Sequence, residues 1–146
     1  MRVSTGVSHF AAVFLALAAG PIRGSDSGLA EADSAEARLI AEAGGPEELG
    51  AALRILLDGA EKELAAGGTD RVHNLPERIA AAAAKIENDG SLDGKRKKTV
   101  LRRLRRMKWT AEKAHEYADG NRPKAARQGM RKLREEGDKL EEELRR

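Results

Sequence analysis

Apolar side chains recur every three or four residues along most of this chain, which is the spacing of one face of a helix. The clearest row lies in residues 70–88, where the intervals are 3, 4, 3 and 4. Its members are Val72, Leu75, Ile79, Ala82 and Ile86. No segment alternates apolar and polar residues with a period of two, so we predict no strand and an all-α fold.

Three further segments carry similar rows. Residues 47–66 carry Leu49, Leu53, Leu56, Ala60 and Leu64; residues 94–118 carry Val100, Leu104, Met107, Ala111, Ala114 and Ala118; a last segment from Pro123 carries Ala126, Met130, Leu133, Gly137, Leu140 and Leu144. Residues 29–43 form a weaker fifth segment. The intervals resemble those of coiled coils, and the many alanines predict closely approaching helices with a modest core.

Glycine and proline mark short turns between these segments. The turns are Gly44-Gly45-Pro46, Gly67-Gly68, the stretch from Asn88 to Asp93 with Gly94 just beyond it, and Asp119-Gly120-Asn121. Connections this short place consecutive helices antiparallel. We therefore expect an up-down antiparallel bundle of four main helices, with residues 29–43 as an additional short N-terminal helix.

Pro76 stands inside the row of residues 70–88, where it removes one backbone hydrogen bond. One interpretation is a helix that begins at Asp70 and bends at the proline. The other is a late start, with Asn74 as the capping residue and Glu77 completing a capping box. We favour the start at Asp70.

The N-terminus has the order of a secretory signal peptide. Arg2 is followed by an uninterrupted apolar run over residues 10–19, with the small-x-small signal Ala16-Leu17-Ala18 near its end. The alternative is an ordinary first helix, but the run has no polar face to turn toward water. We predict a signal peptide over residues 1–19, a flexible linker over 20–28 and a single helical domain over 29–146. The expected location is periplasmic or secreted.

Composition excludes several kinds of chemistry. The chain has 146 residues and no cysteine, which removes disulfides, zinc–thiolate sites and thiol nucleophiles. No serine has a nucleophile elbow around it, and no glycine-rich phosphate loop is present. We therefore expect a non-enzymatic protein without a cofactor that acts in binding or scaffolding, and self-association is one way in which it could complete a small core.

Charge is distributed unevenly along the chain. Residues 20–90 hold 7 Lys/Arg and 14 Asp/Glu, residues 91–134 hold 16 and 4, and residues 135–146 hold 3 and 6. The centre of the basic block comprises Lys95, Arg96, Lys97, Lys98, Arg102, Arg103, Arg105, Arg106 and Lys108. A turn at Asn121 would lay residue 135 beside about 105 and 142 beside about 98, so that the acidic C-terminal helix pairs with the basic helix. The alternatives are an anionic partner, such as a lipid surface or an acidic protein, and, less favoured for an exported protein, nucleic acid.

Trp109 lies outside the apolar row of its segment. Its neighbours on the helix are Arg102, Arg105, Arg106 and Lys113. An exposed tryptophan among cations would be an anchor for a binding partner. The alternative, which we favour, is that the first helix covers Trp109 with Leu29, Leu39 and Ile40.

Two histidines follow the signal segment, and each adjoins an apolar row. His73 follows Val72 and His115 follows Ala114, and both lie near turns expected at the same end of the bundle. Together they could hold a metal ion or haem iron. The segment that carries His115 is about seven residues longer, which predicts an offset of roughly 10 Å between the two rings. We therefore favour a structural role for both side chains.

The segments Val72–Ile79 and Ala114–Gly120, with Lys132-Leu133 in the helix that follows, resemble small exported bacterial helical-bundle proteins of unassigned role. The expected shape is also similar to that of cytochrome b562. That family needs a methionine in the first bundle helix and a histidine in the last to hold haem. This chain has neither, so the resemblance implies fold and location and transfers no haem ligand.

Overall fold

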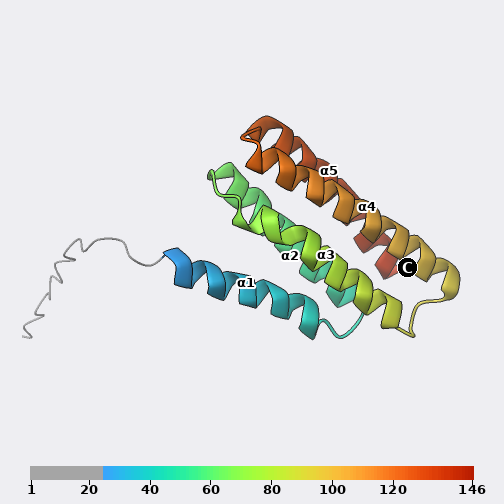
Figure 1. The fold of residues 1–146 in the computed structure, drawn as a ribbon. Coiled ribbons are helices and arrows are strands. Elements are labelled where there is room, and N and C mark those ends of the chain that lie inside the picture. Colours follow the sequence, from blue (N-terminus) through green and yellow to red (C-terminus); the bar gives the residue numbers. More distant parts are fainter. Residues whose placement is uncertain (1–24) are drawn as a thin grey trace, which may run out of the picture.

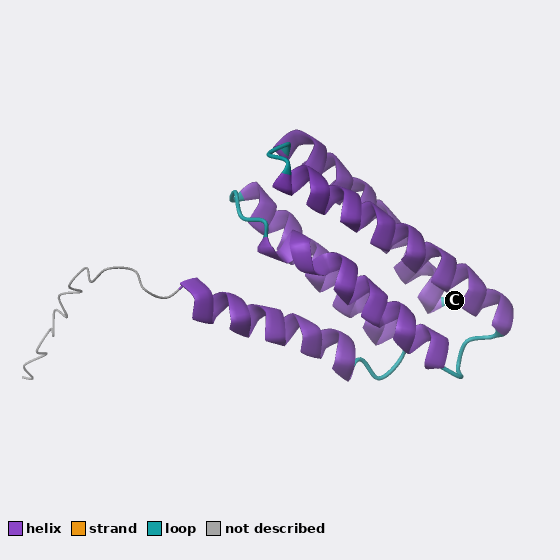
Figure 2. Cartoon of the chain, viewed as in Figure 1, coloured by secondary structure: helices purple, strands orange, loops and turns teal. Residues whose placement is uncertain are grey.

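The computed structural model describes residues 25–146, and this part of the chain is helical throughout, without strands (Figures 1 and 2). Its five helices are α1 (Ser25–Glu42), α2 (Pro46–Ala65), α3 (Asp70–Asn88), α4 (Gly94–Asp119) and α5 (Pro123–Arg145). The prediction of an all-α fold is confirmed. The predicted signal peptide and the start of the predicted linker lie outside the described residues, and α1 begins four residues before the expected start at Leu29.

The helices pack side by side (Figure 1). Helix α4 contacts α3 and α5 most extensively, and α2 contacts the same two helices from the other side. Helix α1 lies against α2 and α3 and, within the described residues, contacts neither α4 nor α5. Helices α2 to α5 supply most of the buried apolar side chains, and α1 contributes Ile40.

The predicted apolar rows line one continuous core. Its members are Ile40, Ala43, Leu49, Ala52, Leu53, Leu56, Leu57, Ala60, Leu64, Val72, Leu75, Ile79, Ala82, Ile86, Leu92, Val100, Leu104, Met107, Ala111, Ala114, Ala126, Met130, Leu133, Leu140 and Leu144. All five members of the row in α3 are buried. No described polar or charged residue is fully buried, so the core depends on apolar packing.

Gly137 interrupts the row of α5 at a point where α2 comes close. A Cβ atom at this position would lie 2.8 Å from the Cδ1 of Leu57 and 3.8 Å from the Cε of Met107. No ordinary side chain fits in that space without displacing Leu57. Glycine here therefore permits the close approach of α2 and α5.

Local capping explains two of the helix boundaries. Asp93 accepts hydrogen bonds from the backbone N–H groups of Lys95 and Arg96, each at 2.9 Å, and thereby caps the start of α4. The turn after α4 contains Asn121, whose φ of 53° is the left-handed conformation that asparagine tolerates. Helix α3 runs from Asp70 through Pro76, so the alternative start at Asn74 is wrong.

Polar contacts join α1 to α3. Arg78 donates to the side chain and the carbonyl of Asp33, and Arg71 pairs with Glu36 at 3.2 Å. Burial raises the pKa of Glu36 against the opposing effect of Arg71 and Arg78.

No helix of the described part is long and apolar enough to cross a membrane.

Candidate metal site

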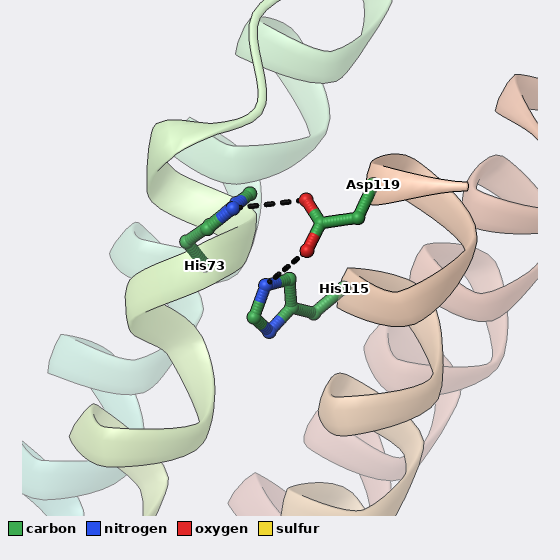
Figure 3. A group of neighbouring side chains, drawn as sticks. All are labelled: His73, His115 and Asp119. Atoms are coloured by element: carbon green, nitrogen blue, oxygen red, sulfur yellow. Dashed lines mark ion pairs between the residues drawn. The ribbon is translucent and has the colours of Figure 1, made fainter. Parts of the chain in front are cut away.

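Two predicted histidines meet where α3 begins and α4 ends (Figure 3). His73 lies in the first turn of α3, next to the buried Val72, while His115 lies one turn before the end of α4, next to the buried Ala114. Since α3 and α4 pack along these rows, the two imidazoles are directed to the same edge of the helix pair. Their ring centroids are 4.0 Å apart.

A carboxylate completes the group. The Nε2 atom of His73 lies 3.0 Å from Oδ1 of Asp119, and the Nε2 atom of His115 lies 2.9 Å from Oδ2 of the same side chain. One ligand atom from each of the three residues can be chosen so that all lie within 4.8 Å of one another. Figure 3 shows Asp119 directed between the two rings.

His73 faces an oxygen acceptor with each of its ring nitrogens. Its Nδ1 lies 2.9 Å from the carbonyl oxygen of Thr69, which only accepts, so Nδ1 carries the proton that is donated there. A neutral imidazole then has a bare lone pair on Nε2, pointing at the carboxylate of Asp119. In this tautomer two acceptors face each other, and a cation bound by both would stabilise the arrangement.

The contact of His73 with Thr69 also has the form found around metal-binding histidines. In such sites the nitrogen that does not bind the metal donates to a carbonyl or carboxylate, which fixes the ring and its tautomer. The side chains of His73, His115 and Asp119 retain 38%, 33% and 52% of their exposure, so an ion from solvent could reach them.

The expected offset of roughly 10 Å between the two histidine rings is wrong. With His73 level with His115, residue 88 lies level with about residue 100 on an antiparallel neighbour. The extra length of α4 therefore lies at its beginning, around Gly94–Thr99, where Lys97 reaches back to the carbonyl of Glu87 at 3.2 Å.

Asp119 was absent from the residues predicted for this site. Its signal was the i, i+4 spacing from His115, which places the two side chains on one face of a helix.

The donor set suits a small metal ion better than haem. Two nitrogens and one carboxylate oxygen suit zinc, copper or nickel, with Zn–N and Zn–O bonds of about 2.0–2.2 Å. Haem needs a porphyrin between two ligands on opposite sides of the iron. Rings with centroids only 4.0 Å apart leave no space for that plane.

The predicted binding group of Trp109 and the neighbouring cations lies on the outer side of α4. Its members differ in their exposure and in their ion pairs. Trp109 is 60% exposed, and the described part of α1 does not contact α4, so the prediction that the first helix covers Trp109 is wrong. Arg106 lies 3.7 Å from Glu136, and Lys113 pairs with Glu116, whose hydrogen bond raises the lysine pKa. Arg102 and Arg105 are exposed and line a shallow hollow on α4.

Acidic residues of α5 divide between two neighbours. Arg103 of α4 pairs with Glu136 at 2.9 Å, and Arg96 donates to the backbone carbonyl of Glu143 at 2.8 Å, which shows that α4 and α5 run antiparallel. Glu141, in contrast, pairs with Arg54 of α2 at 2.6 Å. The C-terminal acidic residues therefore neutralise only part of the basic block.

Comparison of the chain with protein-family models, with curated proteins and with solved structures found no match.

Proposed function

We propose that this chain is a non-enzymatic helical-bundle protein that binds a divalent transition-metal ion through His73, His115 and Asp119. The observation that carries the proposal is the convergence of these three donors from two helices. Two ligands of a tetrahedral ion lie roughly 3.3–3.6 Å apart at bond lengths of about 2.0–2.2 Å. Movements of about an ångström, which half-exposed side chains can make, bring the group into that arrangement.

Copper(II) is the ion that such a site should hold most tightly. Sites with nitrogen and oxygen donors follow the Irving–Williams order, in which copper(II) binds more tightly than nickel(II) or zinc(II). Three protein donors leave coordination positions for water or for a ligand from a partner. A binding role is therefore favoured over a purely structural ion, which would have a closed set of four ligands.

The scaffold for this function is, in our proposal, an up-down four-helix bundle of α2 to α5. Both α2 and α4 contact α3 and α5, and ion pairs join α4 to α5 in an antiparallel arrangement, which supports the proposal. A rigid pair of helices would hold the donors at a fixed separation, as in other bundle metal sites. Helix α1 would then be an accessory element.

Export of the protein remains part of the proposal and depends on the N-terminal sequence. A signal peptide over residues 1–19 would deliver the chain to a compartment without a genome, which disfavours nucleic acid as a partner. N-terminal sequencing of the protein made in its host tests this. A start near Ala19 supports export, and an intact Met1 in the soluble cytoplasm contradicts it.

Isothermal titration of the metal-free full chain with copper(II), nickel(II) and zinc(II) chlorides tests the metal site. We expect one site per chain, tightest for copper, with binding weakened at pH 5 because protons compete for the imidazoles. A ligand that binds only the folded state raises its stability, by about 2.7 kcal/mol at a hundred times Kd. That corresponds to a rise in Tm of roughly 5–10 °C for a chain of this size.

Two variants and a matched control locate the ion. We expect His115→Gln and Asp119→Asn each to weaken binding at least about tenfold, the scale of losses at metal sites. Glu116→Gln removes a carboxylate from the same turn of α4 without touching the group, so it should bind as the original chain does. Equal binding by all three variants, or no heat with any metal, would refute the proposal.

A further inference from the structure

A row of cations that pair with none of the described residues, followed by a tryptophan, runs along the outer side of α4. We call it the basic face; its members are Lys95, Lys98, Arg102, Arg105 and Trp109. They follow one another at intervals of 3, 4, 3 and 4 residues, so they share one side of the helix. All five are exposed. At 1.5 Å per residue the row is about 21 Å long.

The other cations of the block have partners within the molecule. Arg103 and Arg106 pair with Glu136, Lys108 pairs with Glu112, and Arg96 donates to a carbonyl of α5. The four cations of the basic face form no ion pair with any described side chain. Ion pairs within the molecule therefore neutralise the cations on the sides of α4 that adjoin other residues. They leave the positive charge of the basic face exposed.

We propose that the basic face is a docking surface for an anionic lipid membrane. Cations are attracted to acidic headgroups, and they can extend along an apolar surface while keeping their charged ends in water. Tryptophan is enriched at the level of the headgroups because its ring is apolar and its N–H is polar. An exposed tryptophan in line with four cations has both features on one side of one helix.

The shape of the row favours a flat partner. Its five exposed side chains project from one side of a single helix, so one flat anionic surface can touch all of them. The hollow beside them is formed by α4 alone and is lined by Thr99 and Leu101 together with the four cations. Duplex nucleic acid and acidic proteins become the competing outcomes of the test.

Trp109 is the only tryptophan of the chain, so its fluorescence reports on this surface alone. Full-length protein is mixed with vesicles of phosphatidylcholine, with or without phosphatidylglycerol, and both sedimentation and Trp109 emission are measured. We expect binding and a blue shift that depend on phosphatidylglycerol and weaken as salt is raised. Any attachment through the apolar run of residues 10–19 would occur with both kinds of vesicle and is subtracted.

Charge-reversal variants distinguish binding by the basic face from a general effect of the protein's net charge. The double variant Arg102→Glu/Arg105→Glu should lose at least tenfold in phosphatidylglycerol-dependent partitioning and should lose the blue shift. The control Arg127→Glu/Arg131→Glu makes the same charge change at exposed positions of α5 and should lose much less. Trp109→Phe should retain part of the binding.

Three results would overturn the proposal: equal losses in the two double variants, binding without a change in Trp109 emission, or a shift produced by a duplex oligonucleotide or polyglutamate but not by the vesicles. Circular dichroism of each variant establishes that the helices are intact, since all four substituted arginines are exposed.

Discussion

The seam between α4 and α5 and the contact of α1 with its neighbours are held by different kinds of interaction. Along α5, five apolar side chains are buried in the core: Ala126, Met130, Leu133, Leu140 and Leu144. Among the side chains of α1 that the structure describes, Ile40 is the one that reaches the core, and Leu39 remains 37% exposed. The described links of α1 to α3 include the polar contacts of Asp33 and Glu36.

The difference indicates which part of the molecule opens first. Burial of a large apolar side chain contributes about 1.5–3 kcal/mol, whereas partly exposed ion pairs contribute about 0–1 kcal/mol. Helix α5 therefore shares the stability of the whole core. Helix α1 should detach in a local opening that leaves α2 to α5 folded.

The largest expected effect comes from removing a core side chain of α5. Leu133→Ala should lower the free energy of unfolding by about 2–5 kcal/mol, since it leaves a cavity among helices that cannot collapse. Urea unfolding followed by circular dichroism measures it. Ile40→Ala removes a similar volume from α1 and should lower the global value less, while raising amide exchange within α1. Equal global losses in the two variants would show that α1 is part of the cooperative core.

The next effect concerns the polar attachment of α1. Arg78→Ala removes the hydrogen bonds to the side chain and carbonyl of Asp33 and should lower the local opening free energy of α1 by about 1 kcal/mol. Hydrogen exchange detected by mass spectrometry would show faster exchange in residues 31–42 and unchanged exchange in α5. Arg38→Ala, at an exposed position of α1, is the control. Faster exchange throughout the chain would contradict the separation of the two regions.

A smaller effect on stability is expected from Asp93, which caps the start of α4. Hydrogen bonds from the backbone N–H groups of Arg96 and Lys95 hold the pKa of Asp93 below its ordinary value of 3.8. The cap therefore stabilises the fold above that value and is lost as pH falls through the lowered pKa. Asp93→Ala should lower Tm at pH 7, and Asp93→Asn should keep the cap while removing its acid titration. An unchanged Tm in the alanine variant would show that α4 needs no cap.

The smallest effect is expected at Glu36. Burial raises its pKa above the ordinary 4.5, so the protonated side chain is the one that favours the attachment of α1. This contribution is complete below pH 4.5 and is lost as pH rises through the raised pKa. Amide exchange of α1 should therefore be slower at pH 4 than at pH 7 after correction for intrinsic rates, and Glu36→Gln should abolish the difference. A strongly loosened α1 in Glu36→Gln at pH 7 would instead show that the ion pair with Arg71 dominates.

The apolar rows were sufficient to predict the helices and most of the core. Each row in α3, α4 and α5 has a single apolar side, and burying that side determines which residues face inward. The two exceptions, Ala118 and Gly137, are only half-buried. Ala118 lies at the end of α4, and Gly137 has no side chain to bury.

The level of one helix relative to the next could not be predicted in the same way. It depends on the path of residues 89–93, where Leu92 is buried and draws the connection toward the core. The sequence indicated that both histidines lie near one end but not that their rings meet. Asp119 needed only the recognition that it stands one turn after His115.

Gly137 has a consequence for how the helices can slide. Coiled-coil-like rows repeat every seven residues, so a shift by one repeat would preserve most apolar contacts at modest cost. Such a shift of α5 would bring Met130 or Leu144 to the place where the Cδ1 of Leu57 now fills the space left by glycine. The missing side chain at Gly137 therefore favours the observed alignment of α2 with α5. Alignments in which α5 is shifted by seven residues would be destabilised by a steric clash with Leu57.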